Sequence, residues 1–107
     1  MSILVIAEHD NFVIKGATLN TVTAAKNIDG DVTLLVAGSD ISSVVDQAKT
    51  ISGLNKILVC DNDLYKNFLA EDLSSLVLNI ANNYSHILAP ATTFGKNLMP
   101  RISAKLD

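Results

Sequence analysis

Two histidines are the first residues of this 107-residue sequence whose type could support chemistry. His9 lies between Glu8 and Asp10 in the polar segment EHDN, and His86 begins an apolar segment. An imidazole between carboxylates could bind a metal ion or transfer a proton, but sequence neighbours do not converge on one ligand without partners from elsewhere. We therefore predict that His9 is a solvated loop residue. His86 is predicted to be a partly buried packing or capping residue.

Two glycine-containing segments, 38–40 (GSD) and 93–96 (TFGK), could cradle a phosphate group. Neither matches a P-loop or the G-x-G-x-x-G fingerprint, so we expect their polar side chains to cap helices. Segment 61–63 (DND) resembles the start of a calcium loop but lacks its later glycine and glutamate, which indicates a turn. Cys60 is expected to be a small buried core residue. The sequence therefore offers no catalytic, cofactor-binding or metal-binding residue.

The elements that position these segments alternate between strands and helices. Residues 3–7 form an apolar run with almost no polar alternation, which is typical of a strand covered on both faces of a parallel sheet. Similar runs, each followed by residues at helical spacing, recur along the chain. The predicted strands are 3–7, 32–37, 56–60 and 86–89. The predicted helices are 17–28, 41–51, 69–84 and a last one that ends near 106.

Each predicted helix carries an apolar stripe. These stripes are Leu19, Val22, Ala25 and Ile28; Ile41, Val44, Val45, Ala48 and Ile51; Leu69, Leu73, Leu76, Val77, Ile80, Ala81 and Tyr84; and Leu98, Ile102 and Leu106. In the last helix, Lys96, Arg101 and Lys105 lie away from the stripe. Ser39 or Asp40 is expected to cap the second helix.

The closing stretch, residues 85–107, is expected to form a strand, a tight turn and a helix. Pro90 ends the strand, Thr92 and Thr93 offer hydroxyls as helix caps, and Gly95 lets another group come close. Pro100 conflicts with a continuous helix, because proline removes one backbone hydrogen bond and clashes with the preceding turn. We therefore predict either a start near residue 97 or a start near residue 94 with a bend at Pro100.

Right-handed crossovers between alternating strands and helices predict an α/β fold with a parallel sheet and helices on both faces. If the third helix returns the chain past the first strand, the strand order is 3-2-1-4. The fold is then a three-layer, Rossmann-like arrangement of the adenine-nucleotide-binding type. Its switch point lies between the first and fourth strands, at loops 8–16 and 90–96.

Composition excludes several function classes. A hydrophobic content of 49% supports one domain with a real core, and the net charge of −3 without a basic cluster gives no source of nucleic-acid affinity. The longest apolar run is far shorter than the roughly 20 residues that cross a bilayer, and no leader pattern precedes it. One cysteine cannot form an internal disulfide. These features predict a soluble, cytoplasmic protein.

Several segments resemble the amino-terminal domain of the electron transfer flavoprotein alpha subunit. They are ILVIAEHDN, ATLNTVTAAK, VTLLVAGSD and, most specifically, SHILAPATTFGKNLMPRISAKLD. The resemblance covers the whole chain. It implies a heterodimer with a beta subunit and an FAD that passes electrons from flavin dehydrogenases, including those of fatty acid β-oxidation, to a membrane quinone reductase. It also implies that FAD is held by a carboxyl-terminal domain absent from this chain, which leaves 1–107 as a scaffold domain without a cofactor.

Two other functions stay open on the residues alone. A stand-alone nucleotide-binding module of the universal-stress type shares this alternation, but the fifth strand and glycine-rich loop of that type are missing from the pattern. A small enzyme would need a paired nucleophile and base, and no spacing in the sequence supplies one. We expect the chain to be a fragment, and we predict that its fourth-strand edge or last helix self-associates because apolar surface there lacks a cover.

Overall fold

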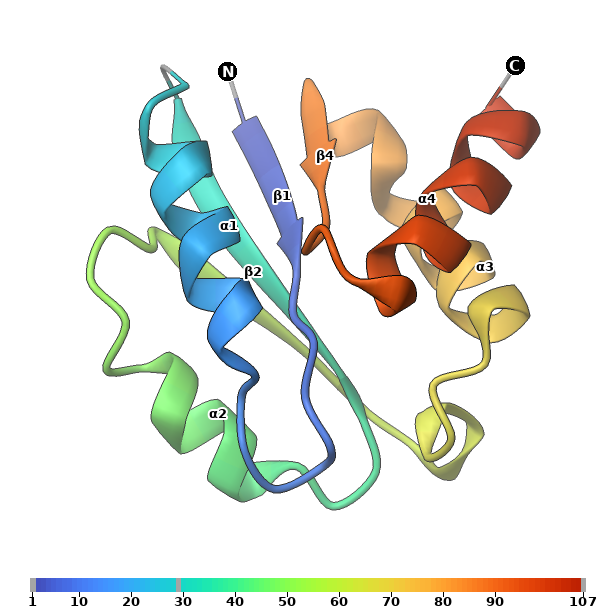
Figure 1. Ribbon diagram of the computed structural model, residues 1–107, viewed down its shortest axis with the longest axis horizontal. Helices are drawn as coiled ribbons and strands as arrows, with labels where there is room; N and C mark the ends of the chain where they lie inside the picture. The colour runs from blue at the N-terminus through green and yellow to red at the C-terminus, as the bar shows by residue number, and fades with distance from the viewer. Residues whose placement is uncertain (1, 29, 107) are drawn as a thin grey trace.

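The computed structural model describes residues 2–28 and 30–106, with side chains up to residue 104. Strands and helices alternate along the chain, and the last helix closes the described part (Figure 1). The elements are β1 (Ser2–Ile6), α1 (Gly16–Lys26), β2 (Asp31–Gly38), α2 (Ser42–Ala48), β3 (Lys56–Asp61), η1 (Asp63–Tyr65), α3 (Ala70–Ile80), η2 (Ala81–Asn83), β4 (His86–Leu88) and α4 (Thr93–Leu106).

The four strands form one parallel sheet in the order β3-β2-β1-β4. β1 is therefore central, and Ile3 pairs with Val32 on one side and with His86 on the other. The predicted strand order and the predicted central strand are both confirmed. The switch point lies where β1 separates the chain's outward path through β2 and β3 from its return to β4.

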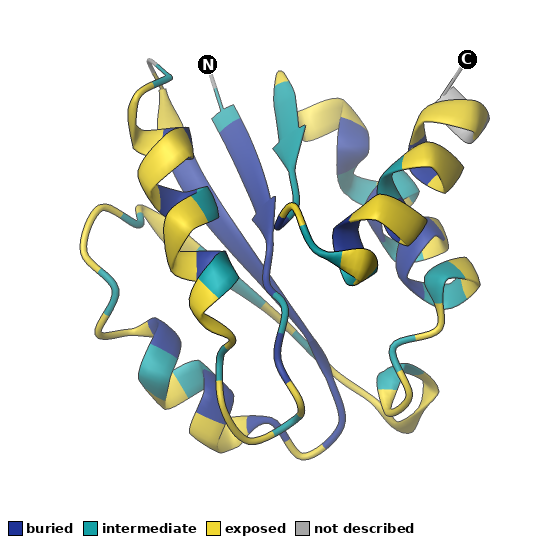
Figure 2. Ribbon diagram, viewed as in Figure 1, coloured by how far each residue is buried: buried dark blue, intermediate teal, exposed yellow. Residues whose placement is uncertain are grey.

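Helices cover both faces of the sheet and make it the middle of three layers (Figure 1). Successive side chains of a strand point to opposite faces, so Ile3 and Val5 face one core while Leu4 and Ile6 face the other. α1 and α2 close the first core, and α3 and α4 close the second. Figure 2 shows the sheet interior as the most continuously buried part of the fold. Each fully buried Leu, Ile or Val contributes about 1.5–3 kcal/mol to folding.

The buried face of α1 differs from the predicted stripe. Val22 and Ala25 are buried as expected, but Leu19 is 48% exposed and Thr18 is buried in its place. Thr18 Oγ1 accepts from the Glu8 backbone N–H at 2.9 Å and donates to the Glu8 carbonyl at 3.1 Å, which fixes the rotation of the helix against the end of β1. The prediction for Leu19 was wrong because this polar contact orients the first turn.

The first three helices, α1, α2 and α3, are shorter than their apolar patterns. α1 and α2 end at Lys26 and Ala48, earlier than predicted, although Ile28 and Ile51 still pack against the first core from the following turns. α3 ends at Ile80, and the predicted last turn is the separate 3-10 helix η2. Leu73 and Val77 are buried, whereas Leu69 precedes α3 and is 56% exposed. Apolar residues at helical spacing therefore extend past the last hydrogen-bonded residue of each of these helices.

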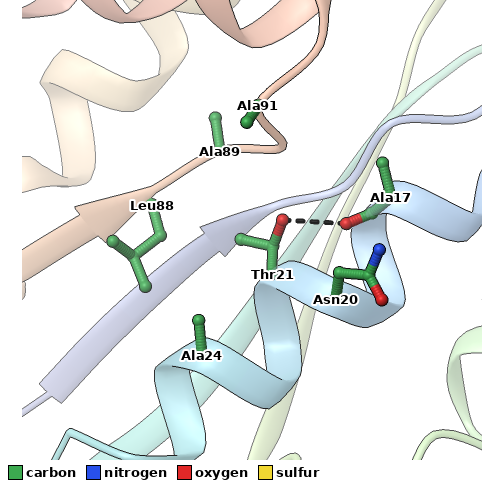
Figure 3. A pocket seen from close by; sticks show the side chains of 7 residues that line it. All are labelled: Ala17, Asn20, Thr21, Ala24, Leu88, Ala89 and Ala91. Carbon is green, nitrogen blue, oxygen red and sulfur yellow. Dashed lines mark hydrogen bonds between the residues drawn. The ribbon is translucent and has the colours of Figure 1, made fainter.

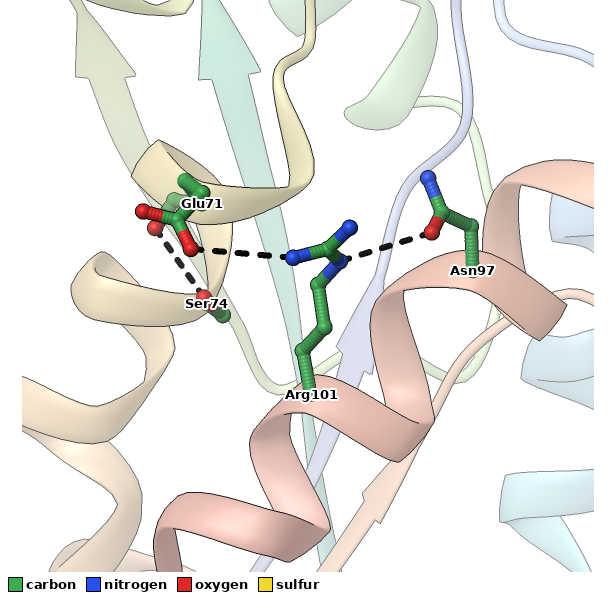
Figure 4. Close-up of polar contacts among 4 residues, drawn as sticks. All are labelled: Glu71, Ser74, Asn97 and Arg101. Carbon is green, nitrogen blue, oxygen red and sulfur yellow. Dashed lines mark hydrogen bonds and ion pairs between the residues drawn. The ribbon is translucent and has the colours of Figure 1, made fainter.

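α4 begins at Thr93 and contains Pro100, so the predicted start near residue 94 is confirmed and the alternative start near residue 97 is wrong. The bend at Pro100 stays a prediction. Leu98 and Ile102 are buried against the sheet as predicted, and Lys96 and Arg101 are exposed. The side chains of the predicted Lys105 and Leu106 lie outside the described residues. Arg101 Nη1 approaches Glu71 Oε1 of α3 at 3.6 Å, and Arg101 Nε donates to Asn97 Oδ1 at 3.4 Å (Figure 4). These exposed contacts add little beside the buried packing.

β4 is an edge strand whose one described partner is β1. Pro90 follows it and is buried, and His86 is half-buried with Nδ1 3.0 Å from Ser85 Oγ, so its prediction as a partly buried residue is confirmed. Self-association through this edge stays a prediction that sedimentation across a dilution series would test.

Among the residues described, no helix has the length and hydrophobicity needed to span a membrane.

Candidate functional site at the carboxyl edge of the sheet

The loops that follow the four strands meet at the carboxyl edge of the sheet, where parallel α/β proteins bind ligands. On the β3 side, the loop after β1 contacts the loops after β2 and β3. On the β4 side, the same loop meets the connection between β4 and α4. The two halves are built differently: the β3 side holds segments 8–11, 38–40 and 61–63, and the β4 side holds segment 93–96.

His9 lies at the centre of the β3-side half and is only 5% exposed. The prediction of a solvated loop histidine is therefore wrong. Its Nε2 is 2.8 Å from the Ala37 carbonyl oxygen, and its Nδ1 is 3.0 Å from the Asn11 backbone nitrogen. The ring also meets Phe68 edge to face, with 5.0 Å between ring centroids. Both ring nitrogens are thus engaged by the protein itself.

These partners define the protonation state of His9. A carbonyl oxygen can only accept and a backbone N–H can only donate, so the ring is neutral, with the proton on Nε2 and the lone pair on Nδ1. Burial lowers the pKa of His9 below its usual 6.5, against smaller raising effects from the Ala37 hydrogen bond and the Asp10 charge. A neutral ring with both nitrogens occupied is not available as a metal ligand or a proton-transfer group.

Asn11 connects the three loops of this half. Its backbone has φ 74°, a left-handed conformation that asparagine tolerates better than most residues. Its Oδ1 accepts from the Ser39 N–H at 3.1 Å, and its Nδ2 donates to the Lys66 carbonyl at 3.1 Å. Gly38 permits this approach, because a Cβ there would lie 2.5 Å from Asn11 Oδ1 and 2.7 Å from His9 Cε1.

The acidic residues after β3 are also satisfied within the protein. Asp61 accepts from the backbone N–H groups of Asp40 and Ile41, and Asp63 Oδ1 accepts from Ser39 Oγ at 2.7 Å. The predicted capping of the second helix by Ser39 or Asp40 is wrong, because Ile41 occupies the N-cap position and Asp61 supplies the carboxylate. Within 2–28 and 30–106, no group of three or more His, Cys, Asp or Glu side chains could hold a metal ion.

Cys60 is half-buried at the end of β3 and packs against the second core. The predicted packing role is therefore confirmed, but full burial is not. Burial raises the pKa of its thiol, so the thiol form is favoured over the nucleophilic thiolate.

The switch point is closed by one side-chain contact between its two loops. Thr92 Oγ1 donates to Glu8 Oε1 at 2.9 Å, and the Lys96 N–H donates to the Thr92 carbonyl at 2.8 Å as α4 begins. The predicted capping role of Thr92 is replaced by this bridge. Gly95 is required because a Cβ at its position would collide with the Pro90 carbonyl oxygen. The prediction that Gly95 permits close approach is confirmed.

A groove of about 370 Å³ lies beside the switch point, between α1 and the end of β4 (Figure 3). Small and apolar side chains dominate its walls, and Thr21 Oγ1 donates to the Ala17 carbonyl of its own helix. The lining residues are Ala17, Asn20, Thr21, Ala24, Leu88, Ala89 and Ala91. None of these side chains is charged, so the groove offers no cation to a phosphate.

A family model described as an electron transfer flavoprotein domain matches residues 3–107. The chain belongs to the electron transfer flavoprotein family. It is 51% identical over its whole length to the electron transfer flavoprotein subunit alpha of Pseudomonas aeruginosa, and 43% identical, again over its whole length, to that of Paracoccus denitrificans. The mitochondrial alpha subunit of Dictyostelium discoideum is 37% identical over 97% of the chain.

The chain spans about a third of the length of these relatives, 35% of the two bacterial subunits and 32% of the Dictyostelium one. The resemblance to the electron transfer flavoprotein family is therefore confirmed. The groove beside the switch point has no cationic side chain and Glu8 places a carboxylate next to it, so neither supplies a charge partner for a dinucleotide phosphate.

Sequence reasoning missed Asn11, Thr18 and Phe68 as residues that build this edge. Thr18 and Asn11 stand in polar or β-branched stretches that look like ordinary loop and surface residues. One signal was available, because an asparagine after a strand often adopts the left-handed conformation and bonds to nearby backbone. Nothing local indicated that Phe68 would reach a histidine 59 positions earlier in the chain.

Proposed function

We propose that this chain is the amino-terminal α/β domain of an electron transfer flavoprotein alpha subunit and acts as a scaffold rather than as the redox centre. The observation that carries the proposal is the match of the whole chain to alpha subunits, of which it covers about a third. In this assignment, the remaining part of the subunit holds FAD. The complete protein is an electron carrier that accepts electrons from flavin dehydrogenases and delivers them to a quinone reductase.

The partner of the scaffold in this proposal is the beta subunit of the same flavoprotein. The self-contained hydrogen bonding of the carboxyl edge supports a structural role, because His9, Asn11, Asp61 and Asp63 bond to this chain's own groups. A nucleotide-binding edge would instead need unengaged backbone N–H groups or cations for phosphate. The universal-stress alternative therefore gains no support from these four side chains, because each is already bonded within the chain.

The proposal can be tested with the purified chain and a purified electron transfer flavoprotein beta subunit. Light scattering after gel filtration should report a one-to-one complex, and titration calorimetry should detect no binding of FAD, AMP or ATP to the chain alone. Stoichiometric nucleotide binding by the isolated chain, with no complex on addition of the beta subunit, would overturn the scaffold assignment and favour a stand-alone nucleotide-binding module. A polar-surface variant of α2, Asp46→Asn, serves as a folding-neutral control.

A further inference from the structure

We propose that His9 is a pH-sensitive pin which, while neutral, holds together the loops after β1, β2 and β3 and, when protonated, releases them. This inference goes beyond the scaffold function, because it assigns a conformational device to the carboxyl edge. The geometry that carries it is the pair of opposite partners on one buried ring, the Ala37 carbonyl at Nε2 and the Asn11 N–H at Nδ1.

Protonation changes one of these two contacts from attractive to repulsive. The imidazolium ring has N–H groups at both positions, so Nε2 still donates to Ala37 but Nδ1 no longer accepts from Asn11. Two donors then face each other across 3.0 Å in a site that is almost closed to water. The Asn11 N–H must therefore move away from the ring, or the ring must leave its place against Phe68.

Movement of Asn11 is transmitted because its side chain bridges the other two loops. Its Oδ1 holds the Ser39 N–H in the turn after β2, and its Nδ2 holds the Lys66 carbonyl after η1. Both contacts depend on the left-handed backbone at Asn11, which is directly adjacent to the contact that protonation breaks. One proton from solvent thus weakens three hydrogen bonds that tie three loops together.

Desolvation of the ring outweighs the surrounding charges and decides the direction of the pH effect. Asp10 is the charged neighbour that favours the imidazolium, but desolvation is larger and keeps the pKa of His9 lowered from 6.5. A lowered folded pKa means that the pinned state is fully stabilised above pH 6.5 and loses stability as the pH falls toward the folded pKa. The other charged residues of the surrounding segments are Glu8, Lys15, Asp40, Asp61, Asp63 and Lys66.

Amide hydrogen exchange measured by NMR tests the device directly on the Asn11 and Ser39 N–H groups. Between about pH 7.5 and pH 5.5, and after correction for intrinsic exchange rates, the protection of both amides should fall up to about tenfold more in wild type than in His9→Gln. The unfolded-state pKa of 6.5 for His9 sets this upper limit on the fall in protection. The matched control is His86→Gln, since His86 is the other histidine of the chain and lies at β4. It should keep the wild-type pH dependence.

An equal fall in wild type and His9→Gln would overturn the proposal, as would pH-independent protection in wild type. If His9→Gln does not fold, an NMR titration of the wild-type imidazole nitrogens gives the same decision. A neutral ring protonated at Nε2 near pH 7, with a midpoint below 6.5, supports the pin. A midpoint at or above 6.5, or a proton on Nδ1, refutes it.

Discussion

The two halves of the carboxyl edge hold their loops together by different interactions. On the β3 side, loops are joined by hydrogen bonds that involve the side chains of Asn11, Ser39 and Asp63 around a buried imidazole. On the β4 side, one hydrogen bond between Thr92 and Glu8 accompanies a close backbone approach at Gly95. The first half should therefore respond most to the loss of a polar atom, and the second to added volume.

Strand length explains the contrast. β2 and β3 run for 8 and 6 residues, whereas β4 has 3. The long strands carry their loops beyond the apolar core, where buried backbone groups need side-chain partners. The short β4 lets Pro90 pack back into the protein, so the following helix starts close to the sheet and leaves no room for a side chain at Gly95.

The largest expected effect is that of Gly95→Ala. The added methyl group collides with the Pro90 carbonyl, a backbone atom that cannot swing aside, so α4 must shift from its place on the second core. Urea denaturation should show a loss of about 3 kcal/mol in the free energy of unfolding. Gly16→Ala is the matched control, because nothing lies within 4 Å of a Cβ at Gly16. Similar stabilities for both variants would contradict the volume argument.

Asn11→Ala should produce the next largest loss, about 2 kcal/mol. The substitution removes partners from the Ser39 N–H and the Lys66 carbonyl and puts alanine at φ 74°. Asn11→Gly separates the two causes, since glycine accepts this backbone conformation and should recover about 1 kcal/mol. Denaturation of both variants gives the comparison. No loss in either variant would mean that the network contributes little and that the halves do not differ as described.

Thr92→Val tests the single bridge at the switch point and should cost about 1 kcal/mol, because valine keeps the shape but cannot donate to Glu8 Oε1. Thr92→Ser retains the hydroxyl and serves as the control. Thermal unfolding of the two variants in parallel measures the difference. A loss for Thr92→Val larger than that for Asn11→Ala would reverse the assignment of polar sensitivity between the halves.

The sheet was predictable from sequence because its determinants are local and repetitive. Apolar runs such as 3–7 define strands, and right-handed crossovers with a third helix that returns the chain past the first strand predict the order 3-2-1-4. Gly95 was predictable for a similar reason, since a glycine shortly after a strand-ending proline, where a helix begins, has few other roles. These features depend on neighbours close in the chain.

The network around His9 was not predictable because its determinants are distant in sequence. Phe68 packs against the His9 ring, and the missing side chain at Gly38 leaves room for that ring in the interior. Neither residue can be identified from the polar segment EHDN. Likewise, the exposure of Leu19 follows from the Thr18 contact with Glu8, which rotates α1 away from the predicted stripe. Polar contacts made by the loop after β1, with other loops and with α1, therefore account for these departures from the sequence prediction.

The smallest expected effect concerns Asp10, which shapes the exposed end of the loop after β1. Its Oδ1 accepts from the Val13 and Phe12 N–H groups at 2.8 and 2.9 Å, and these bonds lower the pKa of Asp10 from 3.8. A lowered folded pKa stabilises the protein above pH 3.8, and this stabilisation disappears as the pH falls through the folded pKa. Asp10→Asn keeps an acceptor but removes the charge, so wild type should be the more stable protein at pH 6 and should lose that advantage below 3.8. Because Asp10 is exposed, the difference should be far smaller than for Asn11→Ala. Denaturation of both proteins across this pH range measures it, and an advantage of wild type that persists below the folded pKa would show that the charge is not its source.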